Sequence, residues 1–538
     1  MPEPRVGACI VILFALFTPG TFTAIVAGQD LRLVDAAASQ DDETVRNLVN
    51  AGTNVNTTRP DGATALLWAT HWNNLDTVDL LLSHEANVNA SDDHGVTPLE
   101  RAAENASLEM VAKLLAAGAN VNASQTSGLT PLMTAARTGN ADIVTMLVTA
   151  GADVNATVNT TQSTALMWAV SEPHPEIVRI LLNAGADPHV STKKGFTPLM
   201  FAARNGAIDT AKSLLTAGVN INGLSADGPH VLPFSIISGQ DAFALFLLDA
   251  GANANGSMDG VHALHAASGS VSMWLGDWYR RHARNRLYAR PGRSRLNSEQ
   301  RLPLVKALLE KGAEPDARIT TSAMVMSYIG YPKKGAFEPF ACGTGDLRNA
   351  TPLWVAAFDM NGAGGQVFSV GESRSNSNVE ILELLLAAGA DQQLTTDDGT
   401  TPLMAAAGLG RATYTPREPR GVRSPSAENA VRILLDAGAN INAVNEADYT
   451  ALHGAAFRGL NEVIEFLVLH GADLDARDFR GRTPYRLAEG SKQSFQFQSW
   501  PETAALLATL GANTELGIAG TVQERLRDVP AESVTDQP

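Results

Sequence analysis

Hydrophobic and polar positions follow one another along most of the chain with the spacing of short amphipathic helices that occur in pairs. The first helix of a pair is rich in small residues, such as Ala102 and Ala103, and the second carries leucine pairs, such as Leu114 and Leu115. Apolar residues at this spacing share one face of a helix, and that face is expected to be buried against its neighbours. The pattern therefore predicts an all-α chain built from helix–turn–helix units.

The same pattern returns in register along the chain. Seven consecutive steps from the first unit to the eighth are 32 to 34 residues long. Self-similarity at this period is typical of solenoids, in which neighbouring units supply each other's core. The units begin at Leu31, Thr64, Thr97, Thr130, Thr164, Thr197, His230, His262, Thr351, Thr401, Thr450 and Thr483.

Local signals mark where the helices begin and end. Threonine at the start of most units predicts an N-cap, and the proline that follows it in several of them suits the first helical turn. Glycines such as Gly118, Gly151 and Gly185 follow the second helix, where a left-handed residue closes a helix. Asn349 and Asp448 stand where other units have a turn glycine, and both residue types tolerate a positive φ.

Because this motif recurs about twelve times in phase, the sequence resembles the ankyrin-repeat family over nearly all of the chain after residue 30. The resemblance implies an ankyrin-repeat solenoid of about twelve units, joined by hairpin-like loops called fingers, with loop insertions in the C-terminal half. We expect regular repeats over residues 30–270, repeats with insertions over 271–438, C-terminal repeats over 439–516 and a polar tail over 517–538. One departure is that histidine at the fourth motif position occurs only as His265 and His453.

Extra residues interrupt three successive units. In regular units the capping glycine lies 21 residues after the first motif position, but this distance is 50 in the unit at His262, 38 at Thr351 and 37 at Thr401. The inserts therefore fall near residues 271–299, 360–377 and 409–427, between the two helices of each unit. Because equivalent loops of stacked units lie side by side, we expect the inserts to meet as one ledge.

The first insert is strongly basic, although the whole chain has a formal net charge of -16. On a helical projection Trp274, Leu275, Trp278 and Tyr279 share one side, and arginines fall opposite. Two interpretations remain open: the aromatic residues pack the insert onto the solenoid while the arginines pair with nearby carboxylates, or the ledge binds an acidic polypeptide, a polyanionic glycan or lipid headgroups. Nucleic acid is a poor match for an exported acidic protein. The candidate anion-binding residues are Arg280, Arg281, Arg284, Arg417, Arg420 and Arg423.

The resemblance also implies a partner-binding surface, because ankyrin proteins mostly bind through finger tips and the exposed end of the first helix. Aromatic residues and arginine at those positions are the types that dominate interface energetics. The aromatic members have no obvious duty in the core, and partial burial against adjacent fingers is the alternative. The candidate residues are His71, Trp72, Phe196, Arg204, Phe358, Tyr449, Phe457 and Arg458.

The N-terminus has the pattern of a secretory signal. Arg5 precedes the apolar run "ACIVILFALF", and Ala27 and Gly28 are small residues where cleavage is expected. The run is shorter than the roughly 20 residues of a spanning helix. We therefore expect residues 1–27 to be a signal peptide and the protein to be periplasmic or secreted, with an uncleaved membrane anchor as the alternative. Removal of Cys9 leaves Cys342 alone, so no internal disulfide is expected.

No catalytic motif is evident in the sequence. His262 and His265 lie one turn apart, but they occupy ordinary motif positions, so a structural role is favoured over a metal site. The finger sequence "VNAS" or "VNAT" creates glycosylation motifs at Asn89, Asn122 and Asn155, which matter only in an organism that glycosylates. We expect a monomeric, non-enzymatic protein without a cofactor that binds a protein partner. The alternatives are an effector delivered to a host cell, and an enzyme or ligand-binding site built from the inserts.

Overall fold

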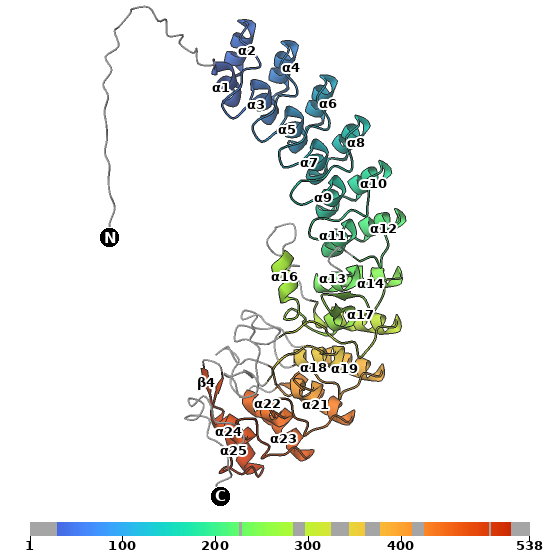
Figure 1. Ribbon diagram of the computed structural model, residues 1–538, viewed down its shortest axis with the longest axis vertical. Coiled ribbons are helices and arrows are strands. Elements are labelled where there is room, and N and C mark those ends of the chain that lie inside the picture. The colour runs from blue at the N-terminus through green and yellow to red at the C-terminus, as the bar shows by residue number, and fades with distance from the viewer. Residues whose placement is uncertain are drawn as a thin grey trace, which may run out of the picture. The chain divides into compact units, whose positions relative to one another are not determined.

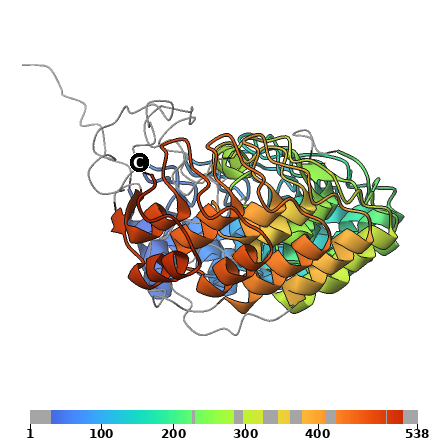
Figure 2. The same ribbon diagram turned by 90° about the horizontal axis from the view of Figure 1, so that it is seen from below.

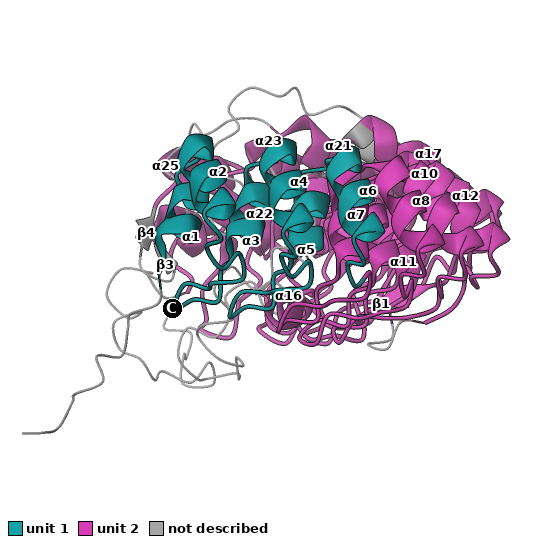
Figure 3. Cartoon of the chain, turned by 90° about the horizontal axis from the view of Figure 1, so that it is seen from above, with its two compact units in different colours: residues 1–120 teal, residues 121–538 magenta. Residues whose placement is uncertain are grey.

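A computed structural model describes residues 30–224, 229–282, 296–323, 344–360, 377–410, 424–493 and 496–517 (Figure 1). The predicted signal, the polar tail after residue 517, residues 283–295 of the first insert and most of the other two inserts lie outside these residues. The chain divides into two compact units, residues 1–120 and residues 121–538 (Figure 3). Each is a series of helix pairs, in which the first and second helix of a pair pack against each other.

The first compact unit contains three helix pairs. In each, a first helix of seven residues is followed by a second helix of nine. The pairs are α1 (Arg32–Ala38) with α2 (Asp42–Asn50), α3 (Ala65–His71) with α4 (Leu75–Ser83), and α5 (Pro98–Glu104) with α6 (Leu108–Ala116).

The second compact unit continues the pattern with nine further pairs among the described residues. Its first six helices are α7 (Pro131–Thr138), α8 (Ala141–Thr149), α9 (Ala165–Ser171), α10 (Pro175–Asn183), α11 (Pro198–Asn205) and α12 (Ile208–Thr216). The pairs in its middle are α13 (Val231–Ile237) with α14 (Asp241–Asp249), α15 (Ala263–Ser268) with α17 (Ser298–Glu310), and α18 (Pro352–Met360) with α19 (Ser377–Ala387). The last pairs are α20 (Pro402–Ala406) with α21 (Pro425–Asp436), α22 (Ala451–Arg458) with α23 (Asn461–Leu469), and α24 (Pro484–Glu489) with α25 (Pro501–Thr509). Seen along the array, this unit gathers its fingers along one edge and its helices along the other (Figure 2).

The predicted N-caps are present. The Thr64 hydroxyl oxygen accepts the backbone N–H of Leu67 at 3.1 Å, which satisfies one of the amides that a helix start leaves unpaired. Equivalent bonds are made by Thr97, Thr130, Thr164, Thr197, Thr351, Thr401, Thr450 and Thr483. The sequence therefore predicted the start of these first helices correctly.

The predicted left-handed turns are also present. Gly151, which follows α8, has a φ of 90°, and a Cβ there would meet nothing within 4 Å, so backbone conformation rather than space explains the glycine. Asn349 and Asp448 have φ values of 65° and 59°, as expected for residues that replace a turn glycine. The motif pattern thus fixes the turns as well as the helices.

A ladder of finger asparagines connects many of the successive repeats within each compact unit. In the second compact unit, Asn122 Nδ2 donates to the Gly151 carbonyl at 3.1 Å, and its Oδ1 accepts the N–H of Asp153 at 2.7 Å. One side chain thereby satisfies a helix end and a finger amide of the following unit. The same pair of bonds is made by Asn56 and Asn89 in the first compact unit and by Asn155, Asn222, Asn255 and Asn442 in the second.

The extra residues fall between the two helices of a unit, as predicted. A short helix, α16 (Gly276–His282), lies between α15 and α17. An antiparallel hairpin of β3 (Ser491–Gln493) and β4 (Gln496–Gln498) lies between α24 and α25. A further small hairpin, β1 (Ser257–Met258) with β2 (Val261–His262), forms the finger before α15. Most of the other two inserts, residues 361–376 and 411–423, lies outside the described residues.

Candidate partner-binding surface

An aromatic cluster stands at the C-terminal end of α3 in the first compact unit. Trp72 is 42% exposed, and its indole Nε1 donates to the Ala38 carbonyl at 3.1 Å. Its ring stacks on Trp68 at 6.5 Å between centroids, and His71 meets it edge-on at 4.6 Å. The cluster therefore holds Trp72 in one orientation while leaving part of the ring accessible. We call Arg59, Trp68, His71 and Trp72 the α3 aromatic cluster.

A basic residue completes this cluster. The Arg59 guanidinium lies over the Trp68 ring at 5.4 Å from its centroid and forms an ion pair with Asp35 at 2.6 Å. A cation over an indole face is attracted by the ring quadrupole, so Arg59 and the rings support each other. His71 and Trp72, both predicted to bind a partner, thus lie together on one surface.

Two predicted arginines lie at the ends of first helices in the second compact unit and are half-buried. Arg204 donates to the Ser171 hydroxyl at 3.0 Å and lies over the Phe201 ring at 5.2 Å. Arg458 packs so closely on Gly408 that a Cβ there would lie 2.6 Å from Arg458 Cγ. Both arginines are therefore partly engaged in holding neighbouring units together.

The expectation that four predicted aromatics lack a role in the core is wrong. Phe196, Phe358, Tyr449 and Phe457 are only 2%, 3%, 6% and 8% exposed. Phe358 stacks on Trp354 at 4.9 Å, and the Phe457 carbonyl accepts the indole N–H of Trp500 at 2.9 Å. Inserts and neighbouring units therefore cover these four rings in the folded chain.

The aromatic side of the first insert is buried, as the helical projection predicted. Trp274, Leu275 and Trp278 are 1%, 0% and 2% exposed. Trp274 Nε1 donates to the Leu347 carbonyl at 3.1 Å, and its ring meets Trp354 edge-on at 6.1 Å. The insert is therefore packed onto the repeats by its aromatic side chains.

The arginines of α16 face the other way. The side chains of Arg280 and Arg281 are 78% and 50% exposed. Arg280 pairs with Asp277 on the same helix, and Arg281 pairs with Asp259 at 3.0 Å. Packing by the aromatics and pairing of these two arginines with carboxylates are thus both observed. The other predicted anion-binding residues, Arg284, Arg417, Arg420 and Arg423, lie outside the described residues.

The bases of the three inserts lie close together. The backbone N–H of Ser270, at the start of the first insert, donates to Asp359 Oδ2 at 3.0 Å, next to the start of the second. A Cβ on Gly410, at the start of the third, would lie 2.8 Å from Phe358. Loops far apart in the chain therefore become neighbours at their bases.

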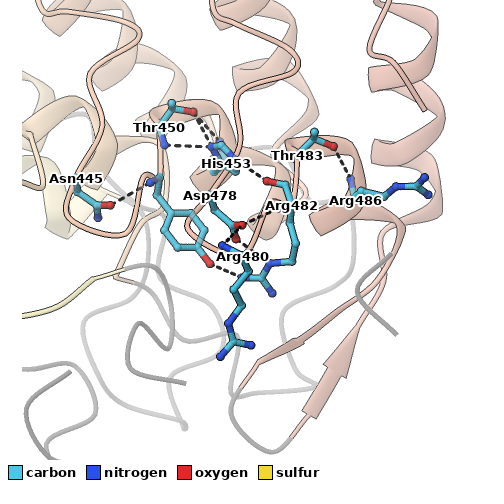
Figure 4. A network of polar contacts seen from close by, with 9 residues as sticks. Asn445, Thr450, His453, Asp478, Arg480, Arg482, Thr483 and Arg486 are labelled. Atoms are coloured by element: carbon cyan, nitrogen blue, oxygen red, sulfur yellow. Dashed lines mark hydrogen bonds and ion pairs between the residues drawn. The ribbon is translucent and has the colours of Figure 1, made fainter. Parts of the chain in front are cut away.

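A buried polar network connects the last units (Figure 4). Arg482 Nε donates to Asp478 Oδ2 at 2.7 Å, and the two side chains are 7% and 0% exposed. Arg482 Nη2 donates to the Tyr449 hydroxyl at 2.7 Å, which explains the burial of that predicted residue. His453 lies between Thr450 and the Arg482 carbonyl, and burial lowers its pKa. The partners of these groups are other residues of the array, so the network has a structural role.

His265 has a structural role as well. Its Nε2 lies 3.1 Å from the Ala317 carbonyl and 3.0 Å from the Ala350 carbonyl, and its Nδ1 accepts the N–H of His262. Complete burial, reinforced by the charge of His262, lowers the pKa of His265 from 6.5 to about 3. A neutral ring thus joins both ends of the finger between α17 and α18 to α15.

Two kinds of site are not found in the described part of the chain. Within those ranges, no three His, Cys, Asp or Glu side chains come together in a way that could hold a metal ion. None of the helices in the same ranges combines the length and the apolar character that crossing a bilayer requires.

Comparison with known families identifies ankyrin repeats in two long stretches of the chain. Models of ankyrin repeats match residues 33–125, 118–192, 181–232, 398–446 and 434–488. Similar proteins include a probable E3 ubiquitin-protein ligase, XBOS34, of Oryza sativa subsp. japonica, which is 34% identical over 98 residues, or 18% of this chain and 16% of the relative. Human ankyrin repeat and SOCS box protein 16 is 32% identical over 160 residues, or 29% of this chain and 32% of the relative. Alpha-latroinsectotoxin-Lt1a of Latrodectus tredecimguttatus is 31% identical over 160 residues, or 29% and 9%. The chain thus spans a third or less of the length of each of these relatives.

Proposed function

Because the chain belongs to the ankyrin-repeat family, whose repeats generally bind protein partners, we propose that it is a non-enzymatic scaffold that binds another protein through the α3 aromatic cluster. The observation that carries this proposal is the 42% exposure of Trp72 within an ordered group of aromatic and basic side chains. Tryptophan and arginine supply most of the binding energy at protein interfaces, and an ordered ring loses little entropy on binding.

The test begins with crosslinking and mass spectrometry in the native compartment, which identifies the partner and the contacting residues together. The affinity of that partner is then measured for the wild type and for Trp72→Ala. We expect a loss of at least about tenfold, because truncation of a hot-spot tryptophan costs about 2 kcal/mol or more of binding and tenfold corresponds to about 1.4 kcal/mol. Crosslinks confined to second helices, or unchanged affinity, would contradict the proposal.

Leu108→Ala is a matched control. Leu108 is 38% exposed, close to the value for Trp72, but it opens a second helix, α6. We expect this variant to bind like the wild type. An equal loss for both variants would indicate a general effect on the fold.

The same complex tests the absence of catalysis. We expect the partner to be released with an unchanged mass, because the sequence has no recognisable catalytic motif. A partner that is cleaved or modified in the presence of the protein would favour the alternative of an active site built from the inserts.

We further propose that the protein is exported, on the basis of the signal-like pattern of residues 1–27. N-terminal sequencing of the native protein should find a chain that starts near Gly28, in the periplasm or the medium. A full-length chain in the membrane fraction would support the anchor instead. A mature chain found inside another cell would support the effector.

The exposed arginines of α16 favour an anionic segment as a secondary contact of the partner. Arg280, at 78% exposure, can exchange its bond to Asp277 for a carboxylate of a bound chain. Polyglutamate should bind the wild type more tightly than an Arg280→Ala, Arg281→Ala variant, with an affinity that falls as salt rises. Binding of heparin or anionic vesicles without binding of polyglutamate would show that the anionic ligand is a glycan or a lipid instead of an acidic polypeptide.

A further inference from the structure

The short helix α16 is an addition to the repeat core rather than part of it. In the unit at Thr97 the first and second helices, α5 and α6, are joined by a short turn and form a complete pair. In the unit at His262, α15 and α17 form the equivalent pair and pack against each other, and α16 lies between them in the sequence. Figure 1 shows α16 beside α13, on the side away from α14. The helix therefore covers a surface that regular units leave open.

The covered surface is aromatic. Trp278 lies 6.1 Å from Phe196 and 5.9 Å from Phe234 between ring centroids. His282, four residues further along α16, stacks on Trp278 at 4.3 Å and lies 5.7 Å from Phe196. Phe196 and Phe234 come from two successive units, so α16 spans the joint between them.

The position of Phe196 is unusual for this chain. The residue immediately before the motif threonine is small or aliphatic in the earlier units, where it is Ala63, Val96, Leu129 and Ser163, and Tyr449 is the one other aromatic residue at this position. Phenylalanine at this position, beside Phe234, presents two rings toward the place where α16 docks. The surface is thus shaped to receive aromatic side chains.

The contacts that attach α16 to the repeats favour its release from them as one helix. It is held to the repeats by the Trp278 and His282 rings and by the ion pair between Arg281 and Asp259, while the buried Trp274 and Leu275 anchor the chain just before it. The helix has only seven residues, and a helix this short is not stable without its docking site. The indole N–H of Trp278 is buried and has no hydrogen-bond partner among the described residues, which makes the docked state less favourable.

We propose that Phe196 and Phe234 form a docking site for an amphipathic helix that carries aromatic rings four residues apart, and that α16 occupies this site within the chain until such a helix from a protein partner displaces it. This proposal rests on the proposed function of binding a protein partner, because it names the kind of partner segment that the site at Phe196 and Phe234 accepts. A helix whose apolar face enters a hydrophobic site is a common mode of peptide recognition, read through anchors at i and i+4.

A synthetic peptide tests the site without any knowledge of the partner. The probe is a fluorescein-labelled peptide of residues 270–282, and its binding is followed by fluorescence anisotropy. The full chain with Trp278→Ala and His282→Ala has lost the rings that fill the site. We expect it to bind the peptide saturably and at least tenfold more tightly than the wild type. The full chain with Ser272→Ala is the matched control and should behave like the wild type, because Ser272 is an exposed residue of the same insert.

Any of three results would overturn the proposal. One is a double variant that has the circular dichroism of the wild type but does not bind the peptide. The second is equal binding by the wild type and the double variant, and the third is equal binding of a Trp278→Ala peptide. None of these results depends on the α3 aromatic cluster, so failure here is separable from failure of the proposed function.

Hydrogen exchange of the wild-type chain decides the matter if the double variant does not fold. We expect the amides of residues 279–282 in α16 to exchange at least ten times faster than those of residues 234–237 in α13, because α16 opens without the repeats. Equal exchange rates would make α16 a permanent part of the core and would overturn the proposal.

Discussion

The side-chain amide of Asn155 donates to the carbonyl oxygen of Gly185 at 3.1 Å, while its Oδ1 accepts the backbone N–H of Asp187 at 2.8 Å. Gly185 ends a second helix and Asp187 begins the next finger, so one asparagine connects two units. Asn89 and Asn122 make the same bonds. These three residues also head the glycosylation motifs seen in the sequence. The motif recurs because the fold needs an amide there, and a glycan on Nδ2 would compete with the bond to the helix end.

Replacement of Asn155 should therefore weaken the array. Asn155→Ala removes both bonds, which are exposed, and we expect the free energy of unfolding to fall by about 1 kcal/mol. Asn155→Asp keeps the acceptor and should lose less. Denaturant unfolding, with hydrogen exchange at Asp187, measures both effects. Asn183→Ala, at the exposed end of α10, is the control, and a loss as large as that of Asn155→Ala would contradict the explanation.

Replacement of a strained alanine should have the opposite effect and stabilise the array. Ala106 has a φ of 53°, at the position where the unit at Thr130 has Gly139 with a φ of 89°. A left-handed conformation costs a residue with a Cβ about 1–2 kcal/mol, and glycine avoids this cost. Glycine also makes the unfolded chain more flexible, which offsets part of the gain in stability. We expect Ala106→Gly to raise the free energy of unfolding by about 0.5 kcal/mol.

The reverse substitution is the control for this prediction. Gly139→Ala should destabilise, because the new Cβ would lie 2.6 Å from the His174 ring in addition to the left-handed backbone. Thermal unfolding of both variants checks the signs. A stabilising Gly139→Ala, or a destabilising Ala106→Gly, would show that the turn is not under strain.

The parts of the fold that the sequence predicted are those determined within one unit. The motif positions of Thr64 and Gly151 have the same capping role in each unit that carries threonine and glycine there. Asn349 could be recognised as a substitute for the turn glycine from its position alone. The aromatic side of the first insert was predicted for the same reason, because Trp274 and Trp278 share a face of one short helix.

The parts that were missed depend on contacts between units. Phe196 is buried by Trp278, which lies far along the chain in an insert, and Tyr449 is buried by Arg482 of the next unit. No periodicity within a unit contains that information. One signal was available: Phe196 stands where Ala63 and Val96 precede the motif threonine, and a large ring at a small-residue position needs something to cover it.

Removal of one partner of the ion pair between Arg482 and Asp478 should strongly destabilise the fold. Arg482→Met leaves the Asp478 carboxylate buried at 0% exposure and the Tyr449 hydroxyl without its donor. We expect the free energy of unfolding to fall by about 3 kcal/mol or more, because an uncompensated buried charge remains. A double variant, Arg482→Met with Asp478→Asn, should recover part of the loss.

Arg486→Met provides the comparison for that pair. Arg486 forms an ion pair with Glu489 at 2.8 Å and donates to the Leu516 carbonyl at 3.0 Å; Glu489 is 41% exposed, so water can replace the ion pair and no buried charge is left behind. We expect a loss of about 1 kcal/mol. Denaturant unfolding of the three variants checks the order, and equal losses for Arg482→Met and Arg486→Met would contradict the role of burial.

Acidification should weaken the joint at His265. In the folded chain, burial holds the pKa of His265 at about 3, whereas the unfolded chain has the ordinary value of 6.5. Between these values the unfolded chain binds a proton that the folded chain does not, so stability is complete above pH 6.5 and is lost as the pH falls toward 3. The loss approaches about 1.4 kcal/mol for each pH unit below 6. His265→Gln keeps a donor for the Ala317 and Ala350 carbonyls but cannot be protonated, so the pH dependence of its stability should be flatter. Unfolding of both proteins at pH 7, 6 and 5 gives the difference that isolates this group, and parallel curves would show that His265 binds its proton equally in both states.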